Sequence, residues 1–160
     1  MAELRTKYVC GRLGKTVAVR LLPGTDLMNG LKKACEENGI RGGAILTAIG
    51  SLRKVTFQIL APSEKSKMGA AYTEPQVTSG PIEILGLNGV ILETESGEVA
   101  LHLHGIFCDK DGKTFGGHLV PGENPILATL DAVIGEVSDA RFMRRYDEET
   151  ELNMFSPERP

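Results

Sequence analysis

His102, His104 and His118 are the only three histidines in this chain of 160 residues. The run from Val99 to Phe107 alternates apolar side chains with other residues, which is the period of a β-strand. This alternation places His102 and His104 on one face of the strand and its leucines on the other. One strand therefore presents two imidazoles to the same side, which suits binding of a transition metal.

A tight turn after this strand brings the third histidine back to the first two. The segment 109–113 contains Gly112, whose freedom to adopt a positive φ suits the end of a three-residue hairpin loop. If such a loop ends at Gly112, the register pairs His104 directly with His118, and both lie on the face of His102. Because directly opposed Cβ atoms are about 4.5–5.5 Å apart, the three rings can share one ion.

Three neutral imidazoles and a water molecule form an open metal site. Nitrogen ligands favour zinc or another divalent transition metal over calcium and magnesium, which prefer oxygen. A zinc-like ion lowers the pKa of its bound water to about 7 and can polarise a carbonyl or phosphoryl oxygen. The sequence thus predicts a metal-binding protein and, by extension, a metal-dependent enzyme of unknown substrate. The alternative is a polar histidine cluster that binds no metal.

A catalytic reaction at this site would also need a general base. Glu123 and Asp109 are the nearest carboxylates in the sequence, although each is also a typical turn residue. Cys108 falls on the histidine face of the predicted strand, so its role is either a metal ligand or redox group or simple packing. These residues are the secondary candidates of the predicted site.

The composition predicts one soluble domain. Hydrophobic residues make up 41% of the chain and charged residues 24%, and no apolar run approaches the roughly 20 residues that cross a bilayer. The first residues lack the apolar core of a secretory signal, so we expect a cytoplasmic protein. Its three cysteines have no CxxC spacing, which predicts neither a disulfide framework nor a thiolate metal site.

The charge balance disfavours nucleic-acid binding without excluding it. The net charge is −3 and the pI is about 5.7, with lysines and arginines dispersed along the chain. Affinity for phosphate backbones comes largely from clustered positive charges, which this sequence does not show.

The remaining pattern predicts an α+β domain with one main helix. Pro23, Gly24 and a cap at Thr25 or Asp26 mark the start of the helix, which ends near Asn38. Two short strands, 9–11 and 16–22, are expected before it around a turn. Further strands are expected at 44–49, 55–60, 82–92, 99–107, 115–120 and 126–137, with an edge strand at 141–146.

The predicted fold is a mostly antiparallel or mixed β-sheet packed around this helix. The segment 126–137 also keeps the spacing of a helix, so a second helix remains an alternative there. We expect a single domain over residues 1–147, followed by an acidic, proline-containing and mobile tail at 148–160.

Four segments in a characteristic order resemble the plants-and-prokaryotes conserved (PPC) domain family, over residues 5–147. They are Pro-Gly-Thr-Asp-Leu at 23–27, Gly-Ala-Ile-Leu-Thr-Ala-Ile-Gly-Ser-Leu-Arg-Lys-Val-Thr at 43–56, Gly-Pro-Ile-Glu-Ile-Leu-Gly-Leu-Asn-Gly at 80–89, and Gly-Gly-His-Leu-Val at 116–120. The resemblance is to the stand-alone prokaryotic type. It implies an α+β domain that associates as a homotrimer.

The resemblance also bears on function. It implies that His102, His104 and His118 bind the cation, as in the metal-containing prokaryotic members. Plant members work in DNA-associated proteins and carry an AT-hook, but this chain has no Arg-Gly-Arg-Pro hook. Around Glu83, Pro81 and Ile82 replace the Arg and Phe of the plant segment, so a plant-type partner function does not transfer. Three interpretations remain: a metal-binding protein, a DNA-binding or scaffolding module, and a histidine cluster that locks the trimer.

Overall fold

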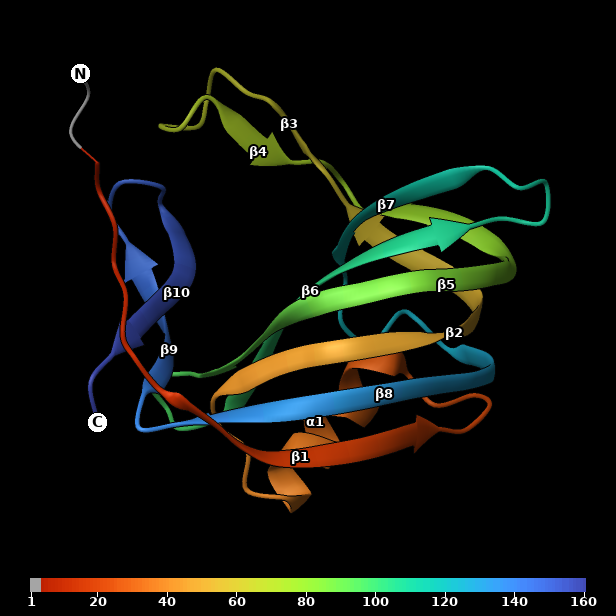
Figure 1. Cartoon of the computed structure of the whole chain (residues 1–160). Helices are drawn as coiled ribbons and strands as arrows, with labels where there is room; N and C mark the ends of the chain where they lie inside the picture. Colours follow the sequence, from red (N-terminus) through yellow and green to blue (C-terminus); the bar gives the residue numbers. More distant parts are fainter. Residues whose placement is uncertain (1–3) are drawn as a thin grey trace.

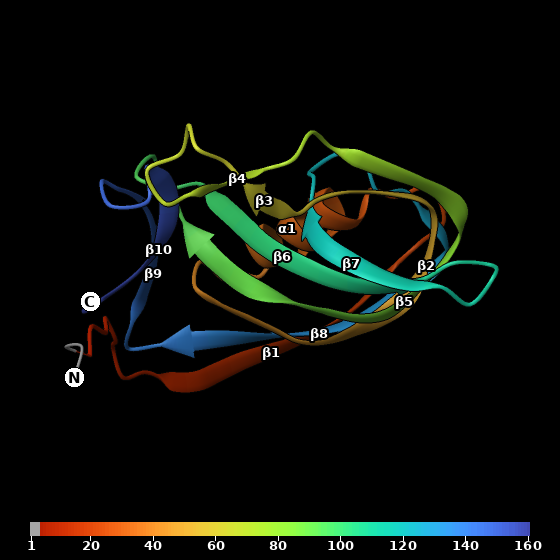
Figure 2. The same cartoon turned by 90° about the horizontal axis from the view of Figure 1, so that it is seen from above.

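The computed structural model describes residues 4–160 as a curved, mostly antiparallel sheet with one helix on its inner side (Figures 1 and 2). The strands are β1 (Arg12–Leu21), β2 (Gly43–Gln58), β3 (Leu60–Pro62), β4 (Ala70–Tyr72), β5 (Gln76–Glu93), β6 (Val99–Cys108), β7 (Thr114–Leu119), β8 (Ile126–Ser138), β9 (Arg141–Asp147) and β10 (Leu152–Glu158), and the helix is α1 (Leu27–Glu37). This architecture confirms the predicted α+β fold class.

Four strands of the main sheet close into a ring. The eight-stranded sheet has the order β1-β8-β2-β7-β6-β5-β9-β10, and β2 additionally pairs with β5. Because β2 pairs with β5 along most of its length and reaches β7 at Phe57, the strands β2, β5, β6 and β7 surround a common interior. Phe57, Phe107 and Phe115 meet there, with ring centroids 5.4–6.5 Å apart. In this closed arrangement of strands, β5 pairs with β6 on one side of the β6–β7 hairpin and β2 pairs with β7 on the other.

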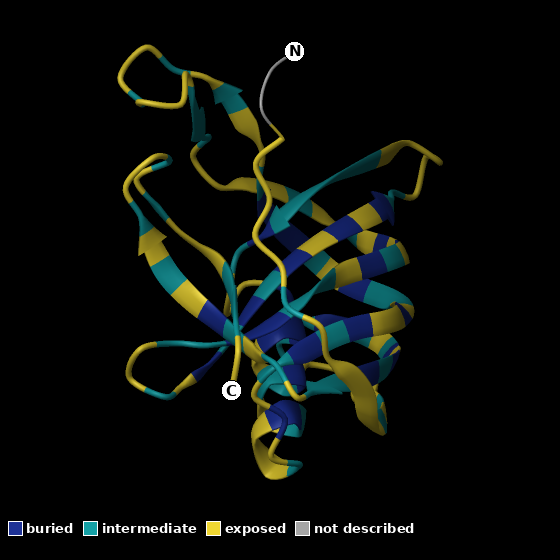
Figure 3. Ribbon diagram, turned by 60° about the vertical axis from the view of Figure 1, so that its left-hand side comes forward, coloured by how far each residue is buried: buried dark blue, intermediate teal, exposed yellow. Residues whose placement is uncertain are grey.

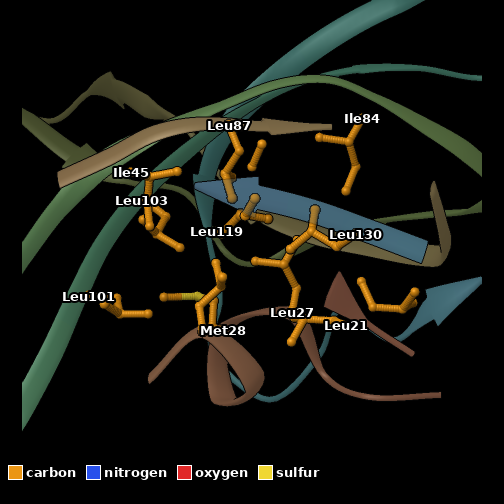
Figure 4. Packing of buried hydrophobic residues seen from close by; sticks show 14 of the residues in the cluster. Leu21, Leu27, Met28, Ile45, Ile84, Leu87, Leu101, Leu103, Leu119 and Leu130 are labelled. Atoms are coloured by element: carbon orange, nitrogen blue, oxygen red, sulfur yellow. The ribbon is translucent and has the colours of Figure 1, made fainter. Parts of the chain in front are cut away.

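Helix α1 fills the inner side of the sheet next to this ring. Asp26 caps the helix, since its carboxylate accepts a hydrogen bond from the backbone N–H of Asn29 at 2.9 Å. Leu27, Met28 and Leu31 are buried on the face of α1 that packs against β1, β6 and β8. Figure 4 shows Leu27 and Met28 among the leucines and isoleucines of the strands. The helix and its cap agree with the sequence prediction. The helix is neither long nor apolar enough to span a membrane, and no other helix is present in residues 4–160.

A buried asparagine fixes the segment that follows β7. Asn124 is fully buried, and its side-chain oxygen accepts a hydrogen bond from the backbone N–H of Thr56 at 2.8 Å. Its side-chain nitrogen donates to the carbonyl of Val120, and its backbone N–H donates to the helix cap Asp26 at 2.8 Å. One residue thus ties the end of β7 to β2 and to the start of α1.

The first strand differs from the sequence prediction, whereas β8 confirms the strand expected at 126–137. Instead of two short strands around a turn, β1 is a single strand that pairs with β8 and absorbs one irregularity between Leu13 and Thr16. The helical alternative for 126–137 is wrong, because β8 pairs with β1 on one side and with β2 on the other. The apolar spacing of this segment fits both a strand and a helix, and its pairing with two strands distant in sequence makes it a strand.

The segment 148–160 is also different from the expected mobile tail. Residues 152–158 form β10, which pairs with β9 from Leu152 opposite Asp147 to Glu158 opposite Arg141. The Glu158 carboxylate accepts a hydrogen bond from Arg145 at 2.8 Å. The acidic and proline-containing composition of this segment did not indicate a strand. Its partner β9 supplies the positive charge of Arg145, which pairs with Glu158.

Replacement of Asn124 tests its role in positioning the end of β7. In Asn124→Ala the backbone N–H of Thr56 loses its partner in a buried site, so we expect the free energy of unfolding to fall by about 2 kcal/mol or more. Urea denaturation followed by circular dichroism measures this change. The exposed Asn153 in β10 provides the control Asn153→Ala, which should change stability by less than about 0.5 kcal/mol. Equal effects of the two substitutions would contradict the assigned role.

Candidate metal centre

The β6–β7 hairpin has the predicted register. His104 pairs with His118, Gly105 with Gly117, and Phe107 with Phe115. The turn closes through a hydrogen bond from the backbone N–H of Asp109 to the carbonyl of Lys113 at 3.1 Å, and Gly112 has a φ of 79°. These observations confirm the three-residue loop and the pairing that was inferred from it.

The alternation along β6 separates core residues from histidines. Leu101, Leu103 and Phe107 are buried, whereas His102 is partly buried and His104 is exposed on the opposite face. Figure 3 shows the same banding of buried and less buried residues along the strands of the sheet. The burial of the leucines therefore fixes the direction in which the imidazoles point.

The three imidazoles converge. His102 Nε2 and His104 Nε2 are 3.0 Å apart, and His118 Nδ1 lies 3.4 Å from His104 Nε2. One ring nitrogen from each histidine lies within 4.8 Å of the other two. A tetrahedral ion with Zn–N bonds of about 2.0–2.1 Å holds its ligand nitrogens about 3.3 Å apart. The separations of the two closest pairs, 3.0 and 3.4 Å, are near this value, so the three rings form a group that could hold one ion.

The surroundings keep two of the rings neutral. Burial, followed by the charges of His102, His104 and Arg144, lowers the pKa of His118 from its ordinary value of 6.5 to about 4. Burial, followed by the charges of His104 and Arg144, also lowers the pKa of His102. A neutral imidazole is the form that donates an electron pair to a metal. At neutral pH both rings are therefore ready to act as ligands.

An aromatic ring covers one side of the cluster. The ring centroid of Tyr72, at the end of β4, lies 4.9 Å from that of His118. Gln58 pairs with His118 across β2 and β7, and its side chain donates to the carbonyl of Thr73 at 2.7 Å. This contact holds the end of the β3–β4 arm next to the histidines. Sequence reasoning missed Tyr72, because no local pattern links the arm to the β6–β7 hairpin.

The secondary candidates lie outside the histidine cluster. The Asp109 carboxylate accepts hydrogen bonds from the backbone N–H groups of Asp111 at 3.0 Å and Lys113 at 2.9 Å, so it stabilises the turn. Glu123 forms an ion pair with Lys54 at 2.5 Å. In residues 4–160 the group of converging potential ligands consists of the histidines, without Cys108 or either carboxylate.

The titration of His118 tests the electrostatics of this site. In metal-free protein we expect its imidazole to remain neutral until the pH falls to about 4. Since the unfolded chain takes up this proton near pH 6.5, the contribution of His118 to stability should be lost as the pH falls from about 6.5 to about 4, and should not change above that range. Long-range ¹H–¹⁵N NMR spectra measure the titration. The urea-unfolded chain serves as the control, and titration of folded His118 near 6.5 would refute the assigned environment.

Two solved structures have a fold similar to that of this chain. A solved structure named as a metal-containing protein from Archaeoglobus fulgidus has a TM-score of 0.79 and 27% identity, covering 94% of this chain and 99% of that one. A candidate DNA-binding protein from Bacteroides thetaiotaomicron has a TM-score of 0.74 and 25% identity, covering 94% and 98%.

A curated relative extends the comparison to a much longer protein. The chain is 33% identical over 132 residues to the Bifunctional protein GlmU of Synechococcus sp. (strain JA-3-3Ab), a match that covers 82% of this chain. The same match covers 19% of that relative, so the chain spans about a fifth of its length. The model of the Plants and Prokaryotes Conserved (PCC) domain matches residues 8–138. The chain therefore belongs to the Plants and Prokaryotes Conserved domain family.

Proposed function

We propose that this protein binds one divalent transition metal ion, with zinc as the best match, through His102, His104 and His118. The observation that carries the proposal is the convergence of three ring nitrogens, with separations of 3.0 and 3.4 Å for the two closest pairs. Nitrogen ligands at this spacing suit zinc and disfavour calcium and magnesium. The likeness to a protein named as metal-containing supports the same assignment.

The site would leave a coordination position for water or for another ligand. Three protein ligands with a fourth open position are typical of catalytic zinc sites, whereas structural zinc sites use four protein ligands. Glu123 and Asp109 are engaged in an ion pair and in a turn, and neither supports a general base beside the ion. The proposal is therefore metal binding, with room for a small molecule at the ion.

We further propose that the protein is a homotrimer in the cytoplasm. Ile106 lies two residues after His104 on the same face of β6 and is exposed, as are Leu85 of β5 and Ile49 of β2. Large exposed apolar side chains on neighbouring strands are typical of surfaces that pack against another subunit. The three cysteines are free, which agrees with a reducing compartment.

Removal of one ligand tests metal binding and separates it from assembly. Purified protein should contain about one equivalent of metal per chain, and His104→Ala should contain less than about a tenth of that, because two imidazoles hold zinc poorly. Elemental analysis measures the metal. The control Cys108→Ala removes a thiol on the same strand face and should keep full metal content.

Light scattering on the same samples addresses the trimer. A mass of three times 17.2 kDa is expected for both variants. Loss of the trimer together with the metal in His104→Ala would instead favour a histidine cluster that locks the assembly. A wild-type protein that binds no transition metal after metal-replete purification would contradict the proposed function.

DNA binding is the second candidate function, and the likeness to the Bacteroides protein favours it. Its test is an anisotropy titration with duplex DNA at about 50 mM salt, where phosphate contacts are strongest. Because the net charge is −3, we expect no binding even there. Binding that weakens steeply with added salt would favour the DNA candidate over our expectation.

A further inference from the structure

The β3–β4 arm, residues 60–72, contacts the rest of the protein at its base and again at its tip. At the base, the backbone N–H of Thr73 donates to the carbonyl of Ile59 at 2.9 Å. At the tip, the ammonium group of Lys67 donates to the backbone carbonyl of Glu148 at 2.6 Å. Figure 1 shows the tip of the arm near the turn that joins β9 and β10. The arm therefore spans the distance between the main sheet and this turn.

The turn between β9 and β10 is a well-fixed support for the tip. The Asp147 carboxylate accepts hydrogen bonds from the backbone N–H groups of Glu149 at 3.1 Å and Thr150 at 2.9 Å, and from the Thr150 hydroxyl at 3.1 Å. Arg5 binds the Glu149 carboxylate through two hydrogen bonds of 2.8 and 2.9 Å. These contacts hold the turn in one conformation, so the carbonyl that Lys67 binds has a defined position.

The arm is hydrogen-bonded along its length. Leu60 of β3 pairs with Tyr72 of β4, and the backbone N–H of Ser63 donates to the carbonyl of Gly69 at 2.9 Å. Strands joined in this way move together rather than separately. A restraint on Lys67 at the tip therefore also limits the movement of Tyr72.

Tyr72 lies at the end of the arm that faces the histidine cluster. Its ring centroid is 4.9 Å from that of His118, and the two rings are tilted by 38°. An imidazole that holds an ion must turn away from it before the ion can leave. Because rotation of His118 would break the favourable contact with Tyr72, this contact opposes the release of an ion.

We infer that Tyr72 is a positioning residue for His118, and that the arm, held at its tip by Lys67, slows the release of the metal ion. The inference rests on the proposed metal site and adds a regulation of that site. Detachment of the tip from the β9–β10 turn would free Tyr72, and exchange of the ion would then become faster.

The rate at which zinc-loaded protein loses its ion to an excess of a chromogenic chelator tests this inference. Tyr72→Ala should release zinc about fivefold faster, and Tyr72→Phe within about twofold of the wild-type rate, because phenylalanine keeps the ring. Lys67→Ala should release zinc about two- to threefold faster, because one hydrogen bond of the tip is lost. The matched controls are Lys65→Ala, at an exposed lysine of the same turn, and Tyr8→Ala, at a tyrosine that is 81% exposed. Both controls should keep the wild-type rate.

The double variant shows whether the tip acts through the ring. If Lys67 acts by holding Tyr72, the combination of Lys67→Ala with Tyr72→Ala should release zinc no faster than Tyr72→Ala alone. Multiplied effects of the two substitutions would contradict the connection along the arm. Circular dichroism confirms that each variant folds, and elemental analysis before each measurement confirms equal loading with zinc.

A second measurement on metal-free protein keeps this inference distinct from the proposed function. A nuclear Overhauser effect between the rings of Tyr72 and His118 is expected in the wild type, and it should weaken in Lys67→Ala. Failure of the wild type to bind zinc would refute the proposed function, while this signal would still report on the position of Tyr72. Absence of the signal, or an unchanged rate of zinc release in Tyr72→Ala, would overturn the inference and leave metal binding intact.

Discussion

The register of the β6–β7 hairpin is the constraint on which the candidate site depends. His104 lies directly opposite His118 because the turn is closed by the Asp109 carboxylate, which accepts two backbone N–H groups, and by Gly112, which adopts a positive φ. A slip of one residue would move one of these imidazoles to the core face, since side chains alternate along a strand. The turn therefore fixes the relative positions of the histidines, although none of its residues belongs to the histidine cluster.

The same alternation links stability to the site. The inner face of the hairpin supplies Leu103, Phe107 and Leu119 to the core, and each of them is fully buried. The free energy gained by burying these side chains holds the opposite face, with its histidines, in one orientation. Closure of β2, β5, β6 and β7 into a ring then prevents the hairpin from shifting relative to its neighbours. The imidazoles are thus oriented by the packing of the leucines and phenylalanine on the far side of the strand.

Local patterns predicted the features that are encoded locally. The hairpin, its loop and the convergence of the histidines follow from a period of two and one glycine, and the helix follows from its cap and apolar stripe. Other features depend on contacts between distant segments. Tyr72 contacts His118 from a separate arm, the charge of Arg144 in β9 helps to lower the pKa of His118, and β10 is a strand because it pairs with β9. The composition of residues 148–160 is typical of a mobile tail. Composition alone does not show that these residues pair with β9, which is what makes them a strand.

The β3–β4 arm is a two-stranded sheet of its own, set apart from the eight-stranded sheet in Figure 1. It contributes Tyr72 to the histidine site, yet the main sheet is complete without its strands. Mutations, insertions or deletions in the arm can therefore change the chemical environment of the histidines while leaving the scaffold unaltered. The chain thus divides two tasks between separate segments: the main sheet positions the histidines, and the arm supplies the aromatic contact to His118.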